Sequence, residues 1–298
     1  MAASVSVSAL RPGQQIDGVF ACTRKDRLLS RAGTPYLAVE LRDRTGTVQA
    51  RAFRDADLLA GRFERGDLVR VSGLVERFRD ELQIELRAIA RADASEADPA
   101  AFLPSAYRDM EELDGFLEHL AREVYDPGYK ALLAQLLGDG ELRAAWRRAP
   151  CTRNGHHAYL GGLLEHTVAV ATLAQETCLL HVRLDSDLLV TAALVHDIGK
   201  TREFTYGAEF GVSDEGRLLG HVQIGARMLE QRAAQTPQLS DERLLALLHC
   251  VLSHHGPDTA PGRRFASAEA LALARVNALD ASVKGALEHG LNPFSQSS

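Results

Sequence analysis

Between residues 18 and 90, apolar and polar residues alternate with a period of two. Such alternation places apolar side chains on one face of a β-strand. The pattern predicts five strands, at residues 18–23, 36–42, 47–53, 67–73 and 81–88. The turn signal Asp43-Arg44-Thr45-Gly46 makes a hairpin of the second and third strands, and a short helix is expected at residues 55–63. We therefore expect a small β-barrel in this part of the chain.

Beyond residue 109 the apolar residues follow the three- and four-residue spacing of helices. The first helix begins near Leu113, and residues 188–195 form a helix that is apolar nearly all round and is therefore expected to be central. Two short runs, 204–206 and 209–212, predict a small hairpin. The rest is expected to be a helical bundle.

This change of period defines the expected domain organisation. Residues 1–92 form the barrel, residues 93–108 form a small, acidic, proline-containing linker, and residues 109–298 form the helical bundle. The fold class is accordingly multidomain, with a five-stranded β domain followed by an all-α domain.

Composition excludes several classes of protein. A chain of 298 residues with 46% hydrophobic and 25% charged residues is not disordered, collagenous or of low complexity. No apolar run reaches the roughly 18 residues that a membrane-spanning helix needs, and the N-terminus carries no evident export signal. The four cysteines lie far apart without a Cys-x-x-Cys pair, which favours a reducing cytoplasm over a disulfide framework.

Charge and histidine are unevenly distributed. Residues 1–92 hold 16 Lys and Arg against 12 Asp and Glu, whereas the remainder holds 18 against 28. All 11 histidines lie beyond residue 118. An acidic body argues against a protein that binds nucleic acid by charge over its whole surface, although a local basic groove stays compatible with it.

Histidine and aspartate occupy inward-facing positions in the expected helices, namely His166, His196-Asp197, His221, His254-His255 and Asp280. Asp280 shares a helix face with Leu273, Val276, Val283 and Leu287. An unpaired carboxylate on such a stripe is costly, and so is an imidazole without a partner. A single core histidine is usually only hydrogen-bonded, but a divalent-metal centre satisfies all of these groups together.

The barrel motifs are the Gly18 turn, Pro35-Tyr36-Leu37, Leu41-x-Asp43-x-x-Gly46, Gly66-Asp67-x-Val69-x-Val71-x-Gly73 and Leu82-Gln83-Ile84. They resemble the OB-fold of the anticodon-binding domains of tRNA synthetases. Such barrels stack single-stranded bases on aromatic rings. The candidate platforms are Phe20, Tyr36, Phe53 and Phe78, with Arg51, Arg77 and Arg79 nearby for phosphates. Taken singly, an aromatic residue in such a pattern is more often part of the core than a stacking platform, so these four are proposed only as a set.

The order His…His-Asp…Asp resembles the HD superfamily of metal-dependent phosphohydrolases, and the further histidines resemble its two-metal version. The resemblance implies one ion on His166, His196, Asp197 and Asp280, and a second on His221, His254 and His255, with Asp197 bridging. Manganese is favoured, and Co²⁺, Fe²⁺, Ni²⁺ and Zn²⁺ also suit these ligands. A metal-bridging hydroxide would then attack phosphorus without a protein nucleophile.

The two halves together resemble the YhaM-type 3'→5' exoribonucleases, through the barrel motifs and the runs 156–167, 196–200, 214–221 and 253–256. The resemblance implies removal of nucleoside 5'-monophosphates from single-stranded RNA, and also from single-stranded DNA. Catalysis would rest on Asp197 and on Lys200, which is placed to meet a phosphate oxygen or else is a solvated helix cation. His156 and His157 are expected at the mouth of the site, and Arg217 on phosphate.

Two alternatives stay open. An HD centre could serve a phosphodiesterase or phosphatase that acts on a small or cyclic nucleotide. The chain could also be a non-catalytic RNA-binding module with a structural metal. A purely structural site needs only four ligands and no open position, which disfavours the second alternative. The oligomeric state and the identity of the metal are not determined by the sequence.

Overall fold

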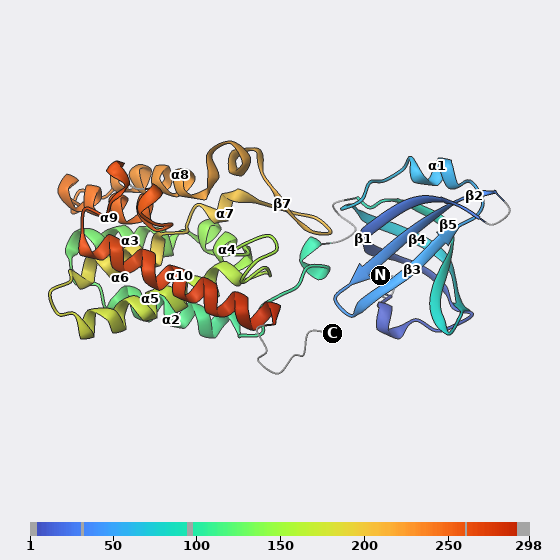
Figure 1. Cartoon of the computed structure of the whole chain (residues 1–298), viewed down its shortest axis with the longest axis horizontal. Helices are drawn as coiled ribbons and strands as arrows, with labels where there is room; N and C mark the ends of the chain where they lie inside the picture. The colour runs from blue at the N-terminus through green and yellow to red at the C-terminus, as the bar shows by residue number, and fades with distance from the viewer. Residues whose placement is uncertain (1–4, 31–32, 94–97, 260, 291–298) are drawn as a thin grey trace. The chain divides into compact units, whose positions relative to one another are not determined.

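The computed structural model describes residues 5–30, 33–93, 98–259 and 261–290 (Figure 1). The chain divides into two compact units. The first comprises residues 1–104 together with 205–211, and the second comprises residues 105–204 together with 212–298.

The first unit contains a closed β-barrel with the strand order β1-β2-β3-β5-β4. Its elements are β1 (Gln15–Leu29), β2 (Pro35–Asp43), β3 (Gly46–Ala52), α1 (Ala56–Ala60), β4 (Leu68–Phe78) and β5 (Glu81–Arg91), with a 3₁₀ turn at Val7–Ala9. Neighbouring strands are antiparallel except β3 and β5, which are parallel. The five expected strands, the hairpin and the short helix are confirmed, and most of the strands are longer than the alternation indicated.

The interior of the barrel follows from the period of two. Buried residues of β2 lie opposite buried residues of β3, in the pairs Leu37–Ala52, Val39–Ala50 and Leu41–Val48. Phe20 of β1 is 0% exposed and belongs to this core. Its expected role as a stacking platform is therefore wrong, because no face of its ring can be reached by a base.

The second unit is helical. Its elements are α2 (Met110–Arg122), α3 (Pro127–Gly138), α4 (Gly140–Arg148), α5 (Gly162–Leu180), α6 (Ser186–Val195), α7 (Lys200–Glu203), α8 (Asp214–Ala233), α9 (Asp241–Ser253) and α10 (Ala268–His289), with 3₁₀ turns at Pro257–Thr259 and Pro261–Arg263. A further 3₁₀ turn, Pro99–Ala101, belongs to the first unit. Side-chain oxygens accept hydrogen bonds from backbone N–H groups at the starts of seven of these helices, at Asp109, Asp126, Asp139, Asp185, Ser213, Ser240 and Ser267.

The core of this unit is built around α6. Every residue from 188 to 195 is buried, which confirms the expected central helix. Helices α2, α3, α5, α9 and α10 all contact α6 (Figure 1). The loop that follows α6 therefore begins in the middle of the bundle, where water is excluded.

The expected small hairpin is also present, as β6 (Phe204–Tyr206) and β7 (Phe210–Val212). Its tip, residues 205–211, is grouped with the barrel. There the backbone N–H of Ala208 donates to the carbonyl of Gly66 at 3.1 Å, and its carbonyl accepts from Arg42 at 2.6 Å.

Two sequence-based expectations concern the chain as a whole. All four cysteines lie in the described part and are free. Within the described residues, no helix is both long enough and apolar enough to cross a bilayer.

Candidate metal centre

The candidate ligands come from five helices or their ends: His166 of α5, His196 and Asp197 just after α6, His221 of α8, His254 and His255 just after α9, and Asp280 of α10. The position of His221 depends on a break in α8. Gly220 has φ 72° and ψ 157°, a backbone conformation that favours glycine, and it interrupts the helix one residue before His221. The break at Gly220 thus sets the backbone position from which the His221 side chain reaches Asp197.

Asp197 lies at the middle of these residues and is 3% exposed. Its Oδ2 is 3.3 Å from Nε2 of His196 and 3.5 Å from Nε2 of His166. Its Oδ1 is 3.3 Å from Nε2 of His221 and 3.4 Å from Nε2 of His254. The two oxygens of one carboxylate therefore face two separate groups of imidazoles.

Backbone carbonyls decide which nitrogen of two rings carries the proton. Nδ1 of His196 is 2.8 Å from the carbonyl oxygen of Ala193, and Nδ1 of His254 is 2.5 Å from that of Val251. A carbonyl oxygen only accepts, so Nδ1 is the donor in both rings. In the neutral ring the other nitrogen, Nε2, then holds a lone pair, which points toward Asp197.

The ring of His166 is oriented in the same way by a carboxylate. Its Nδ1 is 2.6 Å from Oδ2 of Asp280, and its Nε2 is 3.2 Å from Nε2 of His196. Because Nδ1 donates to Asp280, two lone pairs meet where the rings of His166 and His196 approach. Such an approach is repulsive unless a cation lies between the nitrogens.

The second group repeats this arrangement. Nδ1 of His221 lies 3.3 Å from Oε1 of Glu203, and Nε2 of His221 lies 2.8 Å from Nε2 of His255. Oδ1 of Asp197 and Nε2 of His254 are buried without a hydrogen-bond partner among the described residues. An orphaned carboxylate oxygen that faces an orphaned imidazole nitrogen is the expected signature of a metal position.

The donor atoms therefore fit divalent cations. Among the described residues four sets of possible ligand atoms lie within 4.8 Å of one another, and two of the four contain Asp197. These two are His166, His196 and Asp197, and Asp197, His221, His254 and His255. Imidazole nitrogen combined with carboxylate oxygen suits first-row transition ions.

Electrostatics keeps the ligands in the form that binds metal. Burial lowers the pKa of His166 to about 4, and burial together with the neighbouring His254 lowers the pKa of His255 to about 3. Burial alone would raise the pKa of Asp197, but the ammonium of Lys200 holds it well below its usual range. At neutral pH these rings are neutral and the carboxyl group is ionised, as ligation requires.

The barrel carries a cluster of aromatic rings and arginines on its surface. Tyr36 and Phe53 are stacked with ring centroids 5.3 Å apart. The guanidinium of Arg51 lies 5.9 Å from the ring of Tyr36 and 5.5 Å from that of Phe78, and that of Arg79 lies 5.3 Å from Phe78. Phe53 is 49% exposed and Phe78 is 48% exposed. Three of the four expected platforms therefore form one accessible group.

Comparison with known proteins finds two families along the chain. A family model described as an HD domain matches residues 163–282, and one described as an OB-fold nucleic acid binding domain matches residues 21–90. The chain is 29% identical over 245 residues to the 3'-5' exoribonuclease YhaM of Bacillus velezensis, which covers 82% of this chain and 77% of that protein.

It is 28% identical to the YhaM proteins of Shouchella clausii (83% of this chain, 76% of that protein) and Bacillus subtilis (82% and 77%). Over most of its length the chain is therefore similar to the YhaM exoribonucleases of these bacteria. The HD match begins just before His166 and ends just after Asp280, so the matched range includes every candidate ligand. The resemblance in the sequence and the expected fold class are both confirmed.

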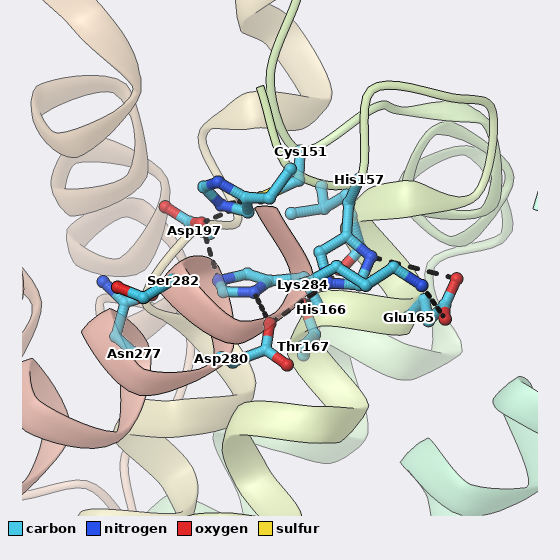
Figure 2. Close-up of polar contacts among 12 residues, drawn as sticks. Cys151, His157, Glu165, His166, Thr167, Asp197, Asn277, Asp280, Ser282 and Lys284 are labelled. Atoms are coloured by element: carbon cyan, nitrogen blue, oxygen red, sulfur yellow. Dashed lines mark hydrogen bonds and ion pairs between the residues drawn. The ribbon is translucent and has the colours of Figure 1, made fainter. Parts of the chain in front are cut away.

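Asp280 is arranged differently from the expectation for this HD domain. Its Oδ2 approaches Nδ1 of His166, the nitrogen on the opposite edge of the ring from the one that faces Asp197 (Figure 2). It thus orients His166, and direct ligation by Asp280 stays a prediction. The expected apolar stripe of α10 is also only partly correct, because the buried residues of α10 all lie in its first half while Val283 and Leu287 are exposed.

Lys200 is buried, and its Nζ donates to Oδ2 of Asp197 at 2.7 Å and to Sγ of Cys151 at 3.3 Å. The solvated-cation alternative for this residue is therefore wrong. The same thiol lies 3.5 Å from Nε2 of His156, which is half-buried. The sequence gives no signal for Cys151, because no ligand spacing connects this residue with the HD motif. Contact between Lys200 and phosphate stays a prediction.

Two further expected substrate contacts can be located. His157 is 1% exposed and lies behind Asp280, with its Nε2 3.1 Å from Oδ2, so it is not at the mouth of the site. Arg217 is exposed in the first turns of α8 and pairs with Asp214 at 3.1 Å. Glu165 and Lys284, which contact each other beside the site, were missed, although Glu165 immediately precedes a ligand.

Proposed function

We propose that this protein is a divalent-metal-dependent 3'→5' exoribonuclease that shortens single-stranded RNA and releases nucleoside 5'-monophosphates. The observation that carries the proposal is the carboxylate of Asp197, whose two oxygens face two separate groups of imidazole nitrogens. This geometry suits a pair of cations, and a pair of cations suits displacement at phosphorus. The similarity to exoribonucleases over most of the chain supports the same activity.

We assign the first ion to His166, His196 and Asp197, with Asp280 as a further ligand or as the group that orients His166. We assign the second ion to Asp197, His221, His254 and His255. Mn²⁺ is the first ion to test, followed by Co²⁺, Fe²⁺, Ni²⁺ and Zn²⁺. When bound, such a pair supplies an activated water and neutralises the charge that develops on the phosphate.

The residues of the chain have distinct tasks in this proposal. Asp197 holds both halves of the centre together through its two oxygens. Lys200 stays protonated although it is buried, because the neighbouring Asp197 raises its pKa. When substrate enters, its ammonium contacts a non-bridging phosphate oxygen. The backbone carbonyls of Ala193 and Val251 hold two imidazoles in the tautomer that ligates.

The aromatic cluster of the barrel is assigned to the substrate strand. Tyr36, Phe53 and Phe78 offer ring faces to bases, and Arg51 between them offers charge to phosphate. Stacking of this kind contributes about 1–3 kcal/mol per base and tolerates any sequence. Such a surface also accepts single-stranded DNA, which we therefore propose as a second substrate.

Free cysteines are consistent with a reducing compartment, and we propose the cytoplasm.

The direct test incubates purified protein and Mn²⁺ with single-stranded RNA that is labelled at either end. Digestion from the 3' end gives a descending ladder from 5'-labelled RNA, whereas 3'-labelled RNA releases labelled mononucleotide at once. Circular RNA of the same sequence should resist. Single internal cuts, or cleavage from the 5' end, would refute the proposal.

The two alternative functions are tested by adding cyclic and small nucleotides as substrates to the same assay and by measuring RNA binding. Hydrolysis of cyclic or small nucleotides with RNA left intact would indicate a nucleotide phosphodiesterase instead. Binding of RNA without any hydrolysis, by protein that holds two ions per chain, would indicate a binding module.

A further inference from the structure

Next to the metal centre, a chain of part-buried polar contacts runs from Asp280 to the edge of the helical unit. His157 Nε2 lies 3.1 Å from Oδ2 of Asp280, and His157 Nδ1 lies 2.9 Å from the hydroxyl of Tyr159. That hydroxyl is 2.8 Å from Oε2 of Glu165, whose Oε1 accepts from Lys284 at 3.1 Å. We call these four residues, His157, Tyr159, Glu165 and Lys284, the His157 array. Figure 2 shows His166 between Asp197 and Asp280, with His157, Glu165 and Lys284 to one side.

The direction of each hydrogen bond follows from what the partners can do. The carboxylate of Glu165 only accepts, so the hydroxyl of Tyr159 donates to it. The oxygen of Tyr159 then accepts from Nδ1 of His157. The carboxylate of Asp280 also only accepts, so Nε2 of His157 donates to it, and with both ring nitrogens protonated His157 is an imidazolium. Asp280 Oδ2 thus receives two N–H donors, one from His157 and one from His166.

The backbone of His157 is held as firmly as its side chain. Its N–H donates to Oε2 of Glu288 at 2.9 Å, and its carbonyl accepts from the N–H of Cys151 at 3.0 Å. Its φ is +51°, a left-handed conformation that costs free energy in a non-glycine residue. A side chain at Gly162 would lie 2.1 Å from the His157 carbonyl oxygen, so only glycine fits there. A strained and over-determined residue of this kind is expected where a functional group must be aimed.

The charges of the array support the same interpretation. Glu165 accepts from Tyr159 and Lys284, and Lys284 also lies 3.6 Å from Glu288 and 5.6 Å from the ring centroid of Tyr159. Each of these acceptors therefore has a donor, and the array forms a continuous connection from α10 through the segment before α5 and α5 itself back to α10. The end of that connection is the carboxylate that orients His166.

We propose that His157 is a positioning residue, which acts through Asp280 to hold the His166 imidazole in the orientation that binds the first metal ion. The inference rests on the proposed function, because it assumes that the His166 group binds a metal. It predicts that the array controls the first ion and leaves the second ion, at His221, His254 and His255, unchanged. Groups that orient a ligand in this way commonly change metal affinity by about 10- to 100-fold.

The test counts bound ions instead of product alone. Metal-free protein is titrated with Mn²⁺, and free Mn²⁺ is measured by electron paramagnetic resonance. The variants are Tyr159→Phe, which removes one oxygen from the array, together with His157→Ala and His157→Gln. The matched control is Tyr125→Phe, which removes an exposed hydroxyl that donates to Glu123 at 3.2 Å.

The Tyr125→Phe control should bind two ions as the unchanged protein does. Tyr159→Phe and His157→Ala should bind one ion about 10- to 100-fold more weakly and the other with unchanged affinity. When less Mn²⁺ is added than both sites can hold, these two variants should show a weaker signal from spin-coupled pairs and a stronger signal from single bound ions than the wild-type protein. His157→Gln should recover part of the affinity, because its amide N–H can donate to Asp280. With RNA, kcat should fall while KM stays nearly constant.

Unchanged affinities in both Tyr159→Phe and His157→Ala would overturn the inference, and so would equal weakening of both ions, which indicates general structural damage. If His157→Ala does not fold, Tyr159→Phe decides alone. Failure of the proposed function is distinguishable. If the wild-type protein binds two ions but leaves RNA intact, the proposed exoribonuclease activity is refuted. The Mn²⁺ titration of the variants still tests the role of His157 in that case.

Discussion

Replacing Gly199 by alanine tests how the second half of the metal centre is held together. Gly199 lies between the His196-Asp197 pair and α7, and its φ of −63° suits any residue. Space is the constraint. A Cβ at this position would lie 2.0 Å from the carbonyl oxygen of His221 and 2.6 Å from the backbone nitrogen of Gly225. Both neighbours are backbone atoms of α8, so no side-chain rotation can relieve the clash.

The size of the effect follows from these distances. Relief of the clash requires α8 to move away by about 1 Å or more, since carbon and oxygen atoms are in contact only beyond roughly 3 Å. Overpacking of this kind costs about 1–3 kcal/mol of folding free energy. For a unit of this size, the melting temperature should fall by about 2–12 °C.

The same movement carries His221 with it, and Nε2 of His221 now lies 3.3 Å from Oδ1 of Asp197. Metal–ligand distances tolerate only about 0.2 Å of change. We therefore expect Gly199→Ala to bind one Mn²⁺ per chain instead of two. Misplacement of a reacting geometry by about 1 Å can cost roughly 100-fold in rate, and RNA digestion should fall by that order.

The assay combines thermal unfolding of metal-free protein with Mn²⁺ titration. The control is Gly115→Ala in α2, where a Cβ would meet no atom within 4 Å and where alanine is the better helix former. That control should be as stable as the unchanged protein or slightly more stable, with both ions bound. A Gly199→Ala protein with unchanged melting temperature and two bound ions would refute the packing argument.

Three further predictions concern the same groups. Asp197→Asn should reduce RNA hydrolysis by about 10³-fold or more, because both ions lose a ligand, while binding of single-stranded RNA in a filter assay persists; the exposed Asp214→Asn should change neither. Phe78→Ala should weaken RNA binding by about 1–3 kcal/mol in a titration, whereas Phe116→Ala, which removes a similar arginine-covered ring from the helical unit, should not. Burial lowers the pKa of His166 from its ordinary value of 6.5 to about 4 in the folded protein. Between these two values the unfolded chain binds a proton that the folded protein does not, so the free energy of unfolding is highest above pH 6.5 and decreases as the pH falls toward 4. Urea unfolding of metal-free protein should therefore show about 2 kcal/mol less stability at pH 5 than at pH 7 from this group, and a His166→Gln protein with the same pH dependence would contradict the assignment.

The amino-acid sequence by itself determined the elements, their order and the chemistry of the centre. Alternation in residues 36–42 and 47–53 was sufficient for β2 and β3, because a strand buried on one face must repeat every second residue. The apolar run 188–195 was sufficient for a central helix. The candidate ligands could be selected because imidazole and carboxylate groups on apolar positions need a common partner, whatever the arrangement of the helices.

Only the tertiary structure decided which atoms of those residues meet. The position of Asp280 at Nδ1 of His166, instead of beside Asp197, depends on how α10 packs against α5. Periodicity shows that a side chain points inward, but it does not show which neighbour it meets there. The same limit applies to Phe20, which alternation could not distinguish from exposed rings, and to His157, whose partners lie as far away as Glu288. Contacts between residues distant in the chain depend on the packing of whole elements, and local spacing carries no information about them.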